Sequence, residues 1–340
     1  MNATSDLRVR RWLLASAAAV VLAVAIGGIT RLTESGLSIT EWRPVSGILP
    51  PRSSTEWFEA YQRYLAIPEA QTVHRGITLG QFQALFWWEW VHRLLARLVG
   101  LILALPYFVL LARGQLRPAH RGRLLLLPLL AAAQGALGWY MVKSGLKVRL
   151  DVSPYRLTAH LGMALVIYII CVWTALDLRA PQPEAGRTPR QLRGWLIAAV
   201  CVTIITMLSG GFVAGLDAGR VYNTFPLMGG QFVPPGYTLP GAGWRNAFEN
   251  PAAAQFHHRV LALVTAVLLL VLAAIGRGPQ LPARLRRATT AAGLIVLVQA
   301  GLGITTLLLK VPVVLGVLHQ VTALALLTAV LAAAHPLKAT

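Results

Sequence analysis

Residues 86–100 of the chain read FWWEWVHRLLARLVG, and this stretch decides the fold. It begins an apolar run that continues to residue 112, and about 20 such residues cross a bilayer as a helix. The run also carries four groups that hydrocarbon disfavours: Glu89, His92, Arg93 and Arg97. Ionisable side chains inside a membrane-spanning helix usually serve a function. The stretch therefore predicts a transmembrane helix and a functional site within it.

Similar runs recur along the whole chain. Of its 340 residues 56% are hydrophobic and 13% are charged, which is far more apolar than a soluble protein of this length needs for its core. We predict an all-α integral membrane protein with eight transmembrane helices. Their expected ranges are 12–30, 86–112, 122–143, 155–178, 194–215, 251–275, 287–309 and 313–334. The first range also resembles a signal peptide, but it is long for one.

The net charge of +19 is distributed as a membrane topology rather than as a nucleic-acid surface. With the N-terminus inside, the inner segments hold sixteen Lys and Arg residues against three acidic residues, whereas the long outer loop at 31–85 has five of each. This is the positive-inside bias, so both termini are predicted to be cytoplasmic. We expect contact with membrane lipid and no nucleic-acid partner.

Short motifs occur twice in the same order, which indicates an internal repeat. The matched pairs are 28–36 (GITRLTESG) with 211–219 (GFVAGLDAG), 88–93 (WEWVHR) with 254–259 (AQFHHR), and 134–138 (QGALG) with 299–303 (QAGLG). We interpret the chain as two four-helix bundles related by duplication. The N-terminal bundle is assigned to 1–180, with the outer loop 31–85, and the C-terminal bundle to 181–340.

One histidine falls in each helix expected to run from outside to inside: His92, His160, His258 and His319. Each lies six or seven residues after the expected helix start, which places all four at one depth near the outer face. Two facing imidazoles at one level in each bundle are what a six-coordinate haem iron requires. The alternative is that each is a hydrogen-bonded polar residue between helices.

Charged neighbours accompany two of these histidines. Arg93 and Arg259 directly follow theirs and could contact the propionates of a haem or extend to lipid headgroups. Glu89 lies three residues before His92, whereas the neutral Gln255 holds the matching position in the second half. This asymmetry predicts proton chemistry in the N-terminal half only. A salt bridge from Glu89 to Arg93 or Arg97 is the alternative.

The sequence closely resembles the haem A synthase family, in the form found in mitochondria and many Gram-negative bacteria. The resemblance rests on 27–51, 86–100, 210–228, 250–259 and 315–327. It implies oxidation of a ring methyl of haem O to a formyl group in two successive hydroxylations, giving haem A for cytochrome oxidase. The cysteine pairs found in the outer loops of Gram-positive members are absent, so a thiol relay is not expected.

The resemblance also implies roles for individual residues. His258 and His319 would hold a permanent haem b, and His92 and His160 would face the substrate haem, with Glu89 as the functional glutamate. It implies a multi-pass protein of the cell inner membrane with haem sites near the periplasmic side. Implied partners are haem O, the farnesyltransferase that makes haem O, and the assembly of cytochrome oxidase. The electron donor and any homo-oligomer stay open.

Other functions remain possible at this stage. A bis-His cytochrome b would carry electrons from quinol without altering either haem, and a transporter would also fit the repeat. A di-iron hydroxylase would need clustered histidines, whereas only His257 and His258 are adjacent here. In the outer loop, the aromatic stripe of residues 54–65 predicts a short helix that either covers the substrate pocket or lies on the membrane surface.

Overall fold

The computed structural model describes residues 3–42, 46–145, 152–179 and 188–335, and within these ranges it is helical with no strand. Eight helices are long and apolar enough to cross a membrane, which confirms the predicted class. They are α1 (Ala3–Leu32), α4 (Leu79–Ala112), α5 (Pro118–Gly145), α6 (Pro154–Asp177), α7 (Arg190–Gly215), α9 (Pro251–Ile275), α10 (Ala283–Leu308) and α11 (Val313–Ala334).

Proline fixes the start of several helices. Pro154 and Pro251 are the first residues of α6 and α9, where a missing N–H costs nothing. Pro312 precedes α11, and the turn before it places Lys310 and Val311 in the left-handed region. The expected ranges of α9 and α11 match the observed ones because proline marks both starts in the sequence.

The expected start of the second transmembrane helix at Phe86 is wrong. Helix α4 begins at Leu79, and Thr78 caps it by accepting a hydrogen bond from Gln81 N–H while Gln81 Oε1 accepts one from Thr78 N–H. This capping box satisfies free backbone groups of the first turn, so the helix extends two turns beyond the apolar run. His92 therefore lies thirteen residues after the first residue of its helix, not six.

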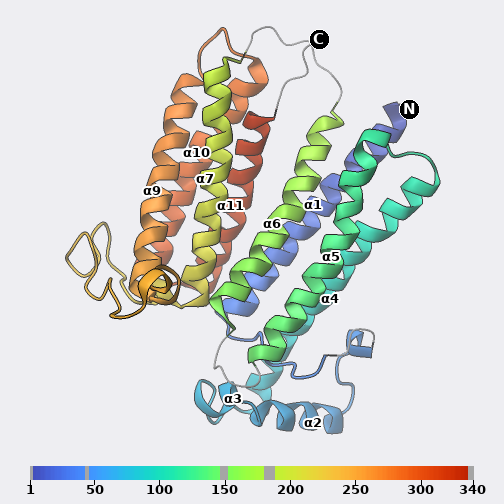
Figure 1. Cartoon of the computed structure of the whole chain (residues 1–340). Coiled ribbons are helices and arrows are strands. Elements are labelled where there is room, and N and C mark those ends of the chain that lie inside the picture. The colour runs from blue at the N-terminus through green and yellow to red at the C-terminus, as the bar shows by residue number, and fades with distance from the viewer. Residues whose placement is uncertain (1–2, 43–45, 146–151, 180–187, 336–340) are drawn as a thin grey trace.

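Each half of the chain forms a ring of four long helices (Figure 1). In the N-terminal ring α1 contacts α4, α4 contacts α5, α5 contacts α6 and α6 returns to α1. The C-terminal ring runs in the same way through α7, α9, α10 and α11. The two rings meet where α6 contacts α7 and α11, and where α1 contacts α11. In both rings the histidine-bearing helices occupy opposite corners.

The two ends of the bundles differ in what they carry. The first residues of α1 and the last residues of α11 lie at one end, and the two long loops lie at the other (Figure 1). This is the arrangement that eight spans require, since an even number of crossings returns the chain to its starting side. The predicted division between residues 180 and 181 falls within 180–187, outside the described residues.

The tightly packed apolar cores lie on the terminal side of the histidines. One cluster joins α1, α4, α5 and α6 with part of α11, and the other joins α7, α9, α10 and α11. Along α6 the buried apolar residues begin at Leu165, five residues after His160, and along α11 they begin at Leu324, five residues after His319. The four histidines themselves are only partly buried by protein atoms.

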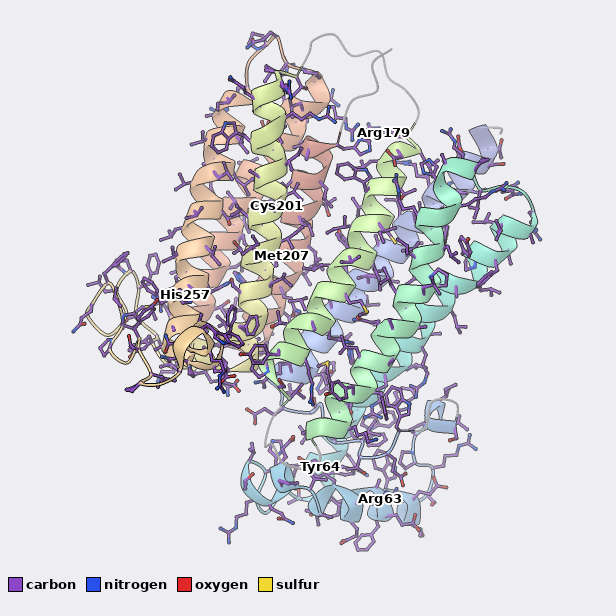
Figure 2. The ribbon with its side chains drawn as sticks, viewed as in Figure 1. Arg63, Tyr64, Arg179, Cys201, Met207 and His257 are labelled. Atoms are coloured by element: carbon purple, nitrogen blue, oxygen red, sulfur yellow. The ribbon has the colours of Figure 1, made fainter. Side chains whose placement is uncertain are left out.

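The long outer loop folds against α4. It contains η1 (Ser46–Ile48), α2 (Ser54–Leu65) and α3 (Pro68–Thr72), and α2 has the predicted bounds. Its aromatic stripe packs on α4, with Trp57 4.9 Å from Phe86 and Tyr64 5.2 Å from Phe82 between ring centroids. Burial beside Glu69 raises the pKa of Tyr64, so its hydroxyl stays protonated. The stripe is therefore the core of a small cap on α4 (Figure 2).

The second long loop contains η2 (Ala218–Arg220), η3 (Gly243–Arg245) and α8 (Asn246–Glu249), and it lies beside the same ends of α7 and α9. Asn250 anchors its end, because the side-chain oxygen accepts from Ala252 N–H at 3.0 Å and the side-chain amide donates to Gly236 O at 2.8 Å. Both loops thus cover the half of the bundles in which the histidines lie.

The closest approach of α6 and α7 depends on Gly215. A Cβ at this position would lie 2.6 Å from Pro154 Cα, and that backbone atom cannot move aside. We expect Gly215→Ala to destabilise the fold by about 1–3 kcal/mol, as overpacking does. Gly194→Ala on the same helix is the matched control, because a Cβ there meets nothing within 4 Å. Thermal unfolding in detergent measures both, and equal midpoints would contradict the close packing.

Candidate functional site

Each intramembrane histidine packs against a glycine of the adjacent helix. A Cβ built on that glycine would approach Cε1 of the imidazole to between 2.9 and 3.4 Å. The pairs are Gly27 with His92, Gly138 with His160, Gly210 with His258, and Gly303 with His319. At Gly27 and Gly303 this distance is 2.9 Å, too short for any Cβ, so the backbone of one helix sets the position of the imidazole on the next.

The structure places the predicted histidines at opposite corners of each ring of helices. His92 lies on α4 and His160 on α6, which face each other across the N-terminal ring. His258 on α9 and His319 on α11 have the same relation in the C-terminal ring. Opposed imidazoles across a four-helix bundle can bind both faces of a flat macrocycle.

The level of the histidines follows from the glycines rather than from the helix starts. Gly27 is five residues before the end of α1 at Leu32, and Gly210 is five residues before the end of α7 at Gly215. Since these glycines contact His92 and His258, both rings lie at the same level relative to matching helix ends. The equal membrane depth of all four histidines stays a prediction, and its basis at Phe86 is wrong.

The ring nitrogens show which partners the protein supplies. Nδ1 of His92, His160 and His319 is buried without a hydrogen-bond partner among the described residues. Nδ1 of His258 is 2.8 Å from the hydroxyl of Ser209. Isolated structural histidines normally satisfy their buried nitrogens, so this pattern does not favour the interpretation of four hydrogen-bonded core residues.

The donor set suits haem better than a bare metal ion. Within the described ranges no group of three or more His, Cys, Asp or Glu side chains is placed to hold a metal ion. A di-iron centre would need such a cluster, whereas a haem iron needs only two axial imidazoles because the porphyrin supplies the other four ligands. The four histidines therefore fit two haem groups, one in each ring.

Glu89 is buried, with 2% of its surface exposed, and both of its oxygens are occupied. Oε1 accepts from Arg93 Nε at 2.9 Å and from Arg93 Nη2 at 2.6 Å. Oε2 accepts from the Ser38 hydroxyl at 2.7 Å and from Ile39 N–H at 2.6 Å. The salt bridge to Arg93, an alternative in the sequence analysis, is thus present, and Glu89 joins the outer loop to α4.

Arg93 and Arg259 make the same contacts in the two halves. Arg93 donates from Nη2 to Ile39 O at 2.7 Å and from Nη1 to Glu41 O at 3.0 Å. Arg259 donates from Nη2 to Tyr222 O and from Nη1 to Thr224 O, both at 2.8 Å. Each guanidinium therefore holds the loop that follows the first helix of its ring. Contact of either with a haem propionate stays a prediction.

The matching position to Glu89 shows the neutral version of this contact. Gln255 is buried and donates from Nε2 to Ala218 O at 2.8 Å, so it also binds the loop above its ring. His257 is not directed at the bundle centre in the same way, because its Nε2 is 2.9 Å from the Tyr237 hydroxyl in the second long loop (Figure 2). The choice of His258 over His257 agrees with the packing of His258 on Gly210.

Two ion pairs cross between the halves at the loop end. Arg31 binds Asp217 at 2.6 Å, and Arg220 binds Glu34 at 3.3 Å. Glu34 and Asp217 hold matching places in the repeated motif, and both have left-handed backbone, with φ of 54° and 50°. Each half thus presents an acid at the end of its first helix to an arginine of the other half.

Sequence reasoning identified Gly27 and Gly210 as positions of close approach to a macrocycle or a neighbouring helix, but it missed Gly138, Gly303 and the glutamines beside the histidines. Gln134 Nε2 donates to His160 O at 3.1 Å, and Gln299 Nε2 is 3.3 Å from His319 Nε2. Gly138 and Gly303, four residues further along, pack on the same two histidines. The repeated motif at 134–138 and 299–303 was the signal, but the sequence does not show which imidazole on a neighbouring helix the motif contacts.

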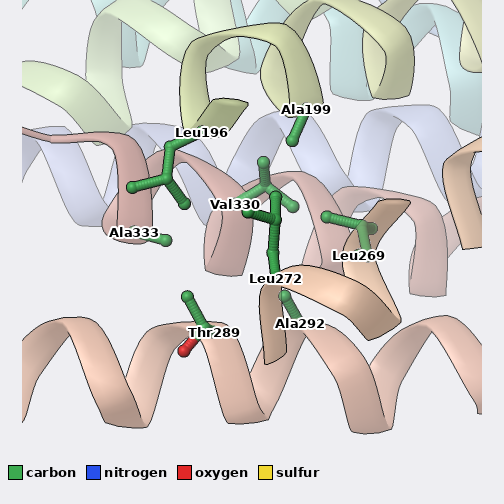
Figure 3. Close-up of a pocket in the computed structure, with 8 residues that line it drawn as sticks. All are labelled: Leu196, Ala199, Leu269, Leu272, Thr289, Ala292, Val330 and Ala333. Atoms are coloured by element: carbon green, nitrogen blue, oxygen red, sulfur yellow. The ribbon is translucent and has the colours of Figure 1, made fainter. Parts of the chain in front are cut away.

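A small cavity elsewhere is unrelated to the site. It has a volume of about 10 Å³ and is lined mainly by aliphatic residues such as Leu196, Leu272 and Val330 in the core of the C-terminal ring (Figure 3). A space of this size holds one water molecule at most. It is a packing gap between α7, α9, α10 and α11.

Comparison with known proteins assigns the chain to a family. Residues 10–331 match the model of the COX15-CtaA family, described as cytochrome oxidase assembly proteins. Because the match covers nearly the whole chain, the protein belongs to this family. The family and the eight membrane-spanning helices agree with the resemblance that the sequence motifs indicate.

Curated relatives carry one name, "Heme A synthase". The protein from Nitrosospira multiformis is 43% identical over 329 residues, covering 96% of this chain and 92% of the relative. The one from Rhodospirillum centenum is 45% identical over 329 residues, covering 96% and 87%. The one from Caulobacter vibrioides is 44% identical over 326 residues, covering 93% and 92%.

The glycine contacts generate a test of the haem sites. We expect Gly303→Ala to displace the His319 ring, because the new Cβ would lie 2.9 Å from Cε1, and to lower the haem content of the purified protein. Gly301→Ala, one half-turn away on α10, is the matched control because a Cβ there meets nothing within 4 Å. Absorbance of the reduced haem, divided by protein concentration, measures the difference. Equal haem content in the two variants would mean that the glycine does not position a ligand.

Proposed function

We propose that the protein is a haem A synthase that oxidises the C8 methyl group of haem O to a formyl group. The observation that carries this proposal is a pair of equivalent histidine sites, of which only one has a buried carboxylate three residues before its first histidine. The relatives named "Heme A synthase" supply the reaction, since the substrate class does not follow from the geometry.

The two sites take different haems in this proposal. His258 and His319 hold a permanent haem b in the C-terminal ring, and His92 and His160 face haem O in the N-terminal ring. The assignment is supported by the position of Glu89 beside His92, because proton transfers accompany oxidation of a methyl group. Gln255 beside His258 has no charge to offer, and an electron-transfer site needs none.

Haem b, when bound, would supply electron transfer. Each of two hydroxylations of the substrate's methyl carbon would consume one O₂, two electrons and two protons and release one water, and the resulting hydrate would lose water to give the formyl group. The protein's own residues orient and enclose the substrate. The imidazoles of His92 and His160, each packed on a glycine, would hold the substrate haem between them. Arg93 holds the loop at residues 38–41 against the same end of the N-terminal ring of helices. The Ser38 hydroxyl donates to Glu89 Oε2 at 2.7 Å and so orients the carboxylate that the proposal assigns to proton transfer.

The remaining expectations belong to this proposal. The two rings derive from a duplication, which the matching loop contacts of Arg93 and Arg259 support. Both termini are cytoplasmic in the cell inner membrane, and the haem sites lie toward the periplasmic side, as the charge bias favours. The protein contacts the farnesyltransferase that makes haem O, and its product serves cytochrome oxidase assembly.

A second candidate is a bis-His cytochrome b that transfers electrons from quinol. The observation that favours it is the full engagement of Glu89, whose two oxygens are bound by Arg93, Ser38 and Ile39. A carboxylate used entirely for holding a loop would leave both sites without proton chemistry. The two candidates therefore differ in whether the charge of Glu89 or only its hydrogen bonds are needed.

Glu89→Gln separates these candidates, because Gln255 shows that a glutamine at this position still binds the loop. We expect the variant to keep haem b and to lose haem A formation by on the order of 100-fold or more, as loss of a general acid–base group does. The measurement is co-expression with a haem O-producing enzyme, followed by chromatography of the extracted haems. Gln255→Ala is the control in the other ring and should still make haem A.

Normal haem A production by Glu89→Gln would assign Glu89 a purely structural role. Wild-type protein that contains only haem b under the same conditions would favour the electron carrier instead.

A further inference from the structure

Ser209 is the side chain that distinguishes the surroundings of His258 from those of the other three histidines. Its hydroxyl is 2.7 Å from Thr206 O and 2.8 Å from His258 Nδ1. The carbonyl oxygen can only accept, so the single hydroxyl proton is donated to Thr206. The hydroxyl oxygen is then left to accept a hydrogen bond from Nδ1–H of His258.

This arrangement selects one tautomer of His258. With the proton on Nδ1, the lone pair is on Nε2, which is the nitrogen free to bind a metal. A ligating histidine usually donates its other ring N–H to an acceptor, and this contact orients the ring and raises its basicity. No side chain makes such a contact with Nδ1 of His92, His160 or His319 within the described ranges.

The corresponding position in the N-terminal ring is apolar. Ser209 precedes Gly210, and Ile26 precedes Gly27. The two glycines lie against their histidines in the same way, with Cβ-to-ring distances of 3.2, 3.7 and 3.8 Å for His258 and 2.9, 3.4 and 3.6 Å for His92, in the order Cε1, Nδ1, Nε2. A hydroxyl at position 26 would therefore reach His92 Nδ1 as Ser209 reaches His258 Nδ1.

We propose that Ser209 is a positioning residue that fixes His258 for binding through Nε2 and so makes the C-terminal site retain its haem, whereas Ile26 offers no hydrogen bond to His92 Nδ1 and leaves the N-terminal site able to exchange its haem. This inference rests on the proposed function, in which one site holds a cofactor and the other releases a product. It assigns the difference between the two sites to one hydrogen bond in otherwise matching scaffolds.

The experiment compares purified full-length variants loaded with haem b. Ser209→Ala should lose haem to an excess of a haem-scavenging apoprotein about 10 to 100 times faster than wild type, in line with the loss of such a contact at other metal sites. Its haem reduction potential should rise, because a less basic imidazole stabilises the oxidised iron less. Ser209→Thr keeps the hydroxyl and should restore both values.

The control variant is Thr203→Val on the same helix. Thr203 is buried and donates only to Ala199 O at 2.7 Å, so its replacement removes a hydroxyl without touching a histidine. Unchanged haem loss and potential in Ser209→Ala would overturn the proposal. So would a change of equal size in Thr203→Val, since the effect would then be a general loosening of α7.

Ile26→Ser tests the same idea in the other ring and decides the matter if Ser209→Ala does not fold. Cells that make haem O should yield Ile26→Ser protein with more haem retained per chain, and with slower loss from the N-terminal site. Retention equal to wild type would overturn the proposal. Haem b loss and reduction potential report on the C-terminal site even in a protein that makes no haem A. The proposed function is tested separately, by extracting the haems from cells that make haem O.

Discussion

The contact between an imidazole and the bare backbone of the neighbouring helix is the constraint on which the structure depends. Four times, a glycine on one helix leaves room for a histidine ring on the next, with Cβ-to-Cε1 distances of 2.9 to 3.4 Å. Such contacts require the two backbones to lie close at that level, so they set the spacing of the helices as well as the position of the rings. The packed apolar clusters on the terminal side then hold this spacing along the helices.

The two rings share a backbone plan and differ in a few side chains. Arg93 and Arg259 bind matching loop carbonyls, and the same glycine positions recur. Two matching positions differ between the halves: Glu89 corresponds to Gln255, and Ile26 corresponds to Ser209. Both substitutions lie within one turn of a histidine or of the glycine that supports it. A common scaffold thus keeps the two sites geometrically alike while their local chemistry diverges.

The sequence predicted the parts of the structure that depend on local signals. Long apolar runs located the eight helices, and prolines located the starts of α9 and α11. The start of α4 was missed because Gln81 and Gln83 interrupt the apolar pattern of its first two turns, where the Thr78–Gln81 cap starts the helix. The histidine partners of the glycines and the Ser209 contact were not predicted because they depend on which helices are neighbours, and repeated motifs show only that two places are alike.

The two histidine sites adjoin the interface between the two rings of helices. Gly28, beside the glycine that supports His92, faces Gln320, beside His319, where a Cβ would come within 2.2 Å of the amide oxygen. In the mirrored position Gly211 faces Thr158, two residues before His160. Residues next to the histidines of both halves therefore meet at this interface. The ion pairs of Arg31 with Asp217 and of Arg220 with Glu34 lie at the loop end of the same interface. A shift of α1 against α11 therefore moves residues beside histidines of both four-helix rings at once.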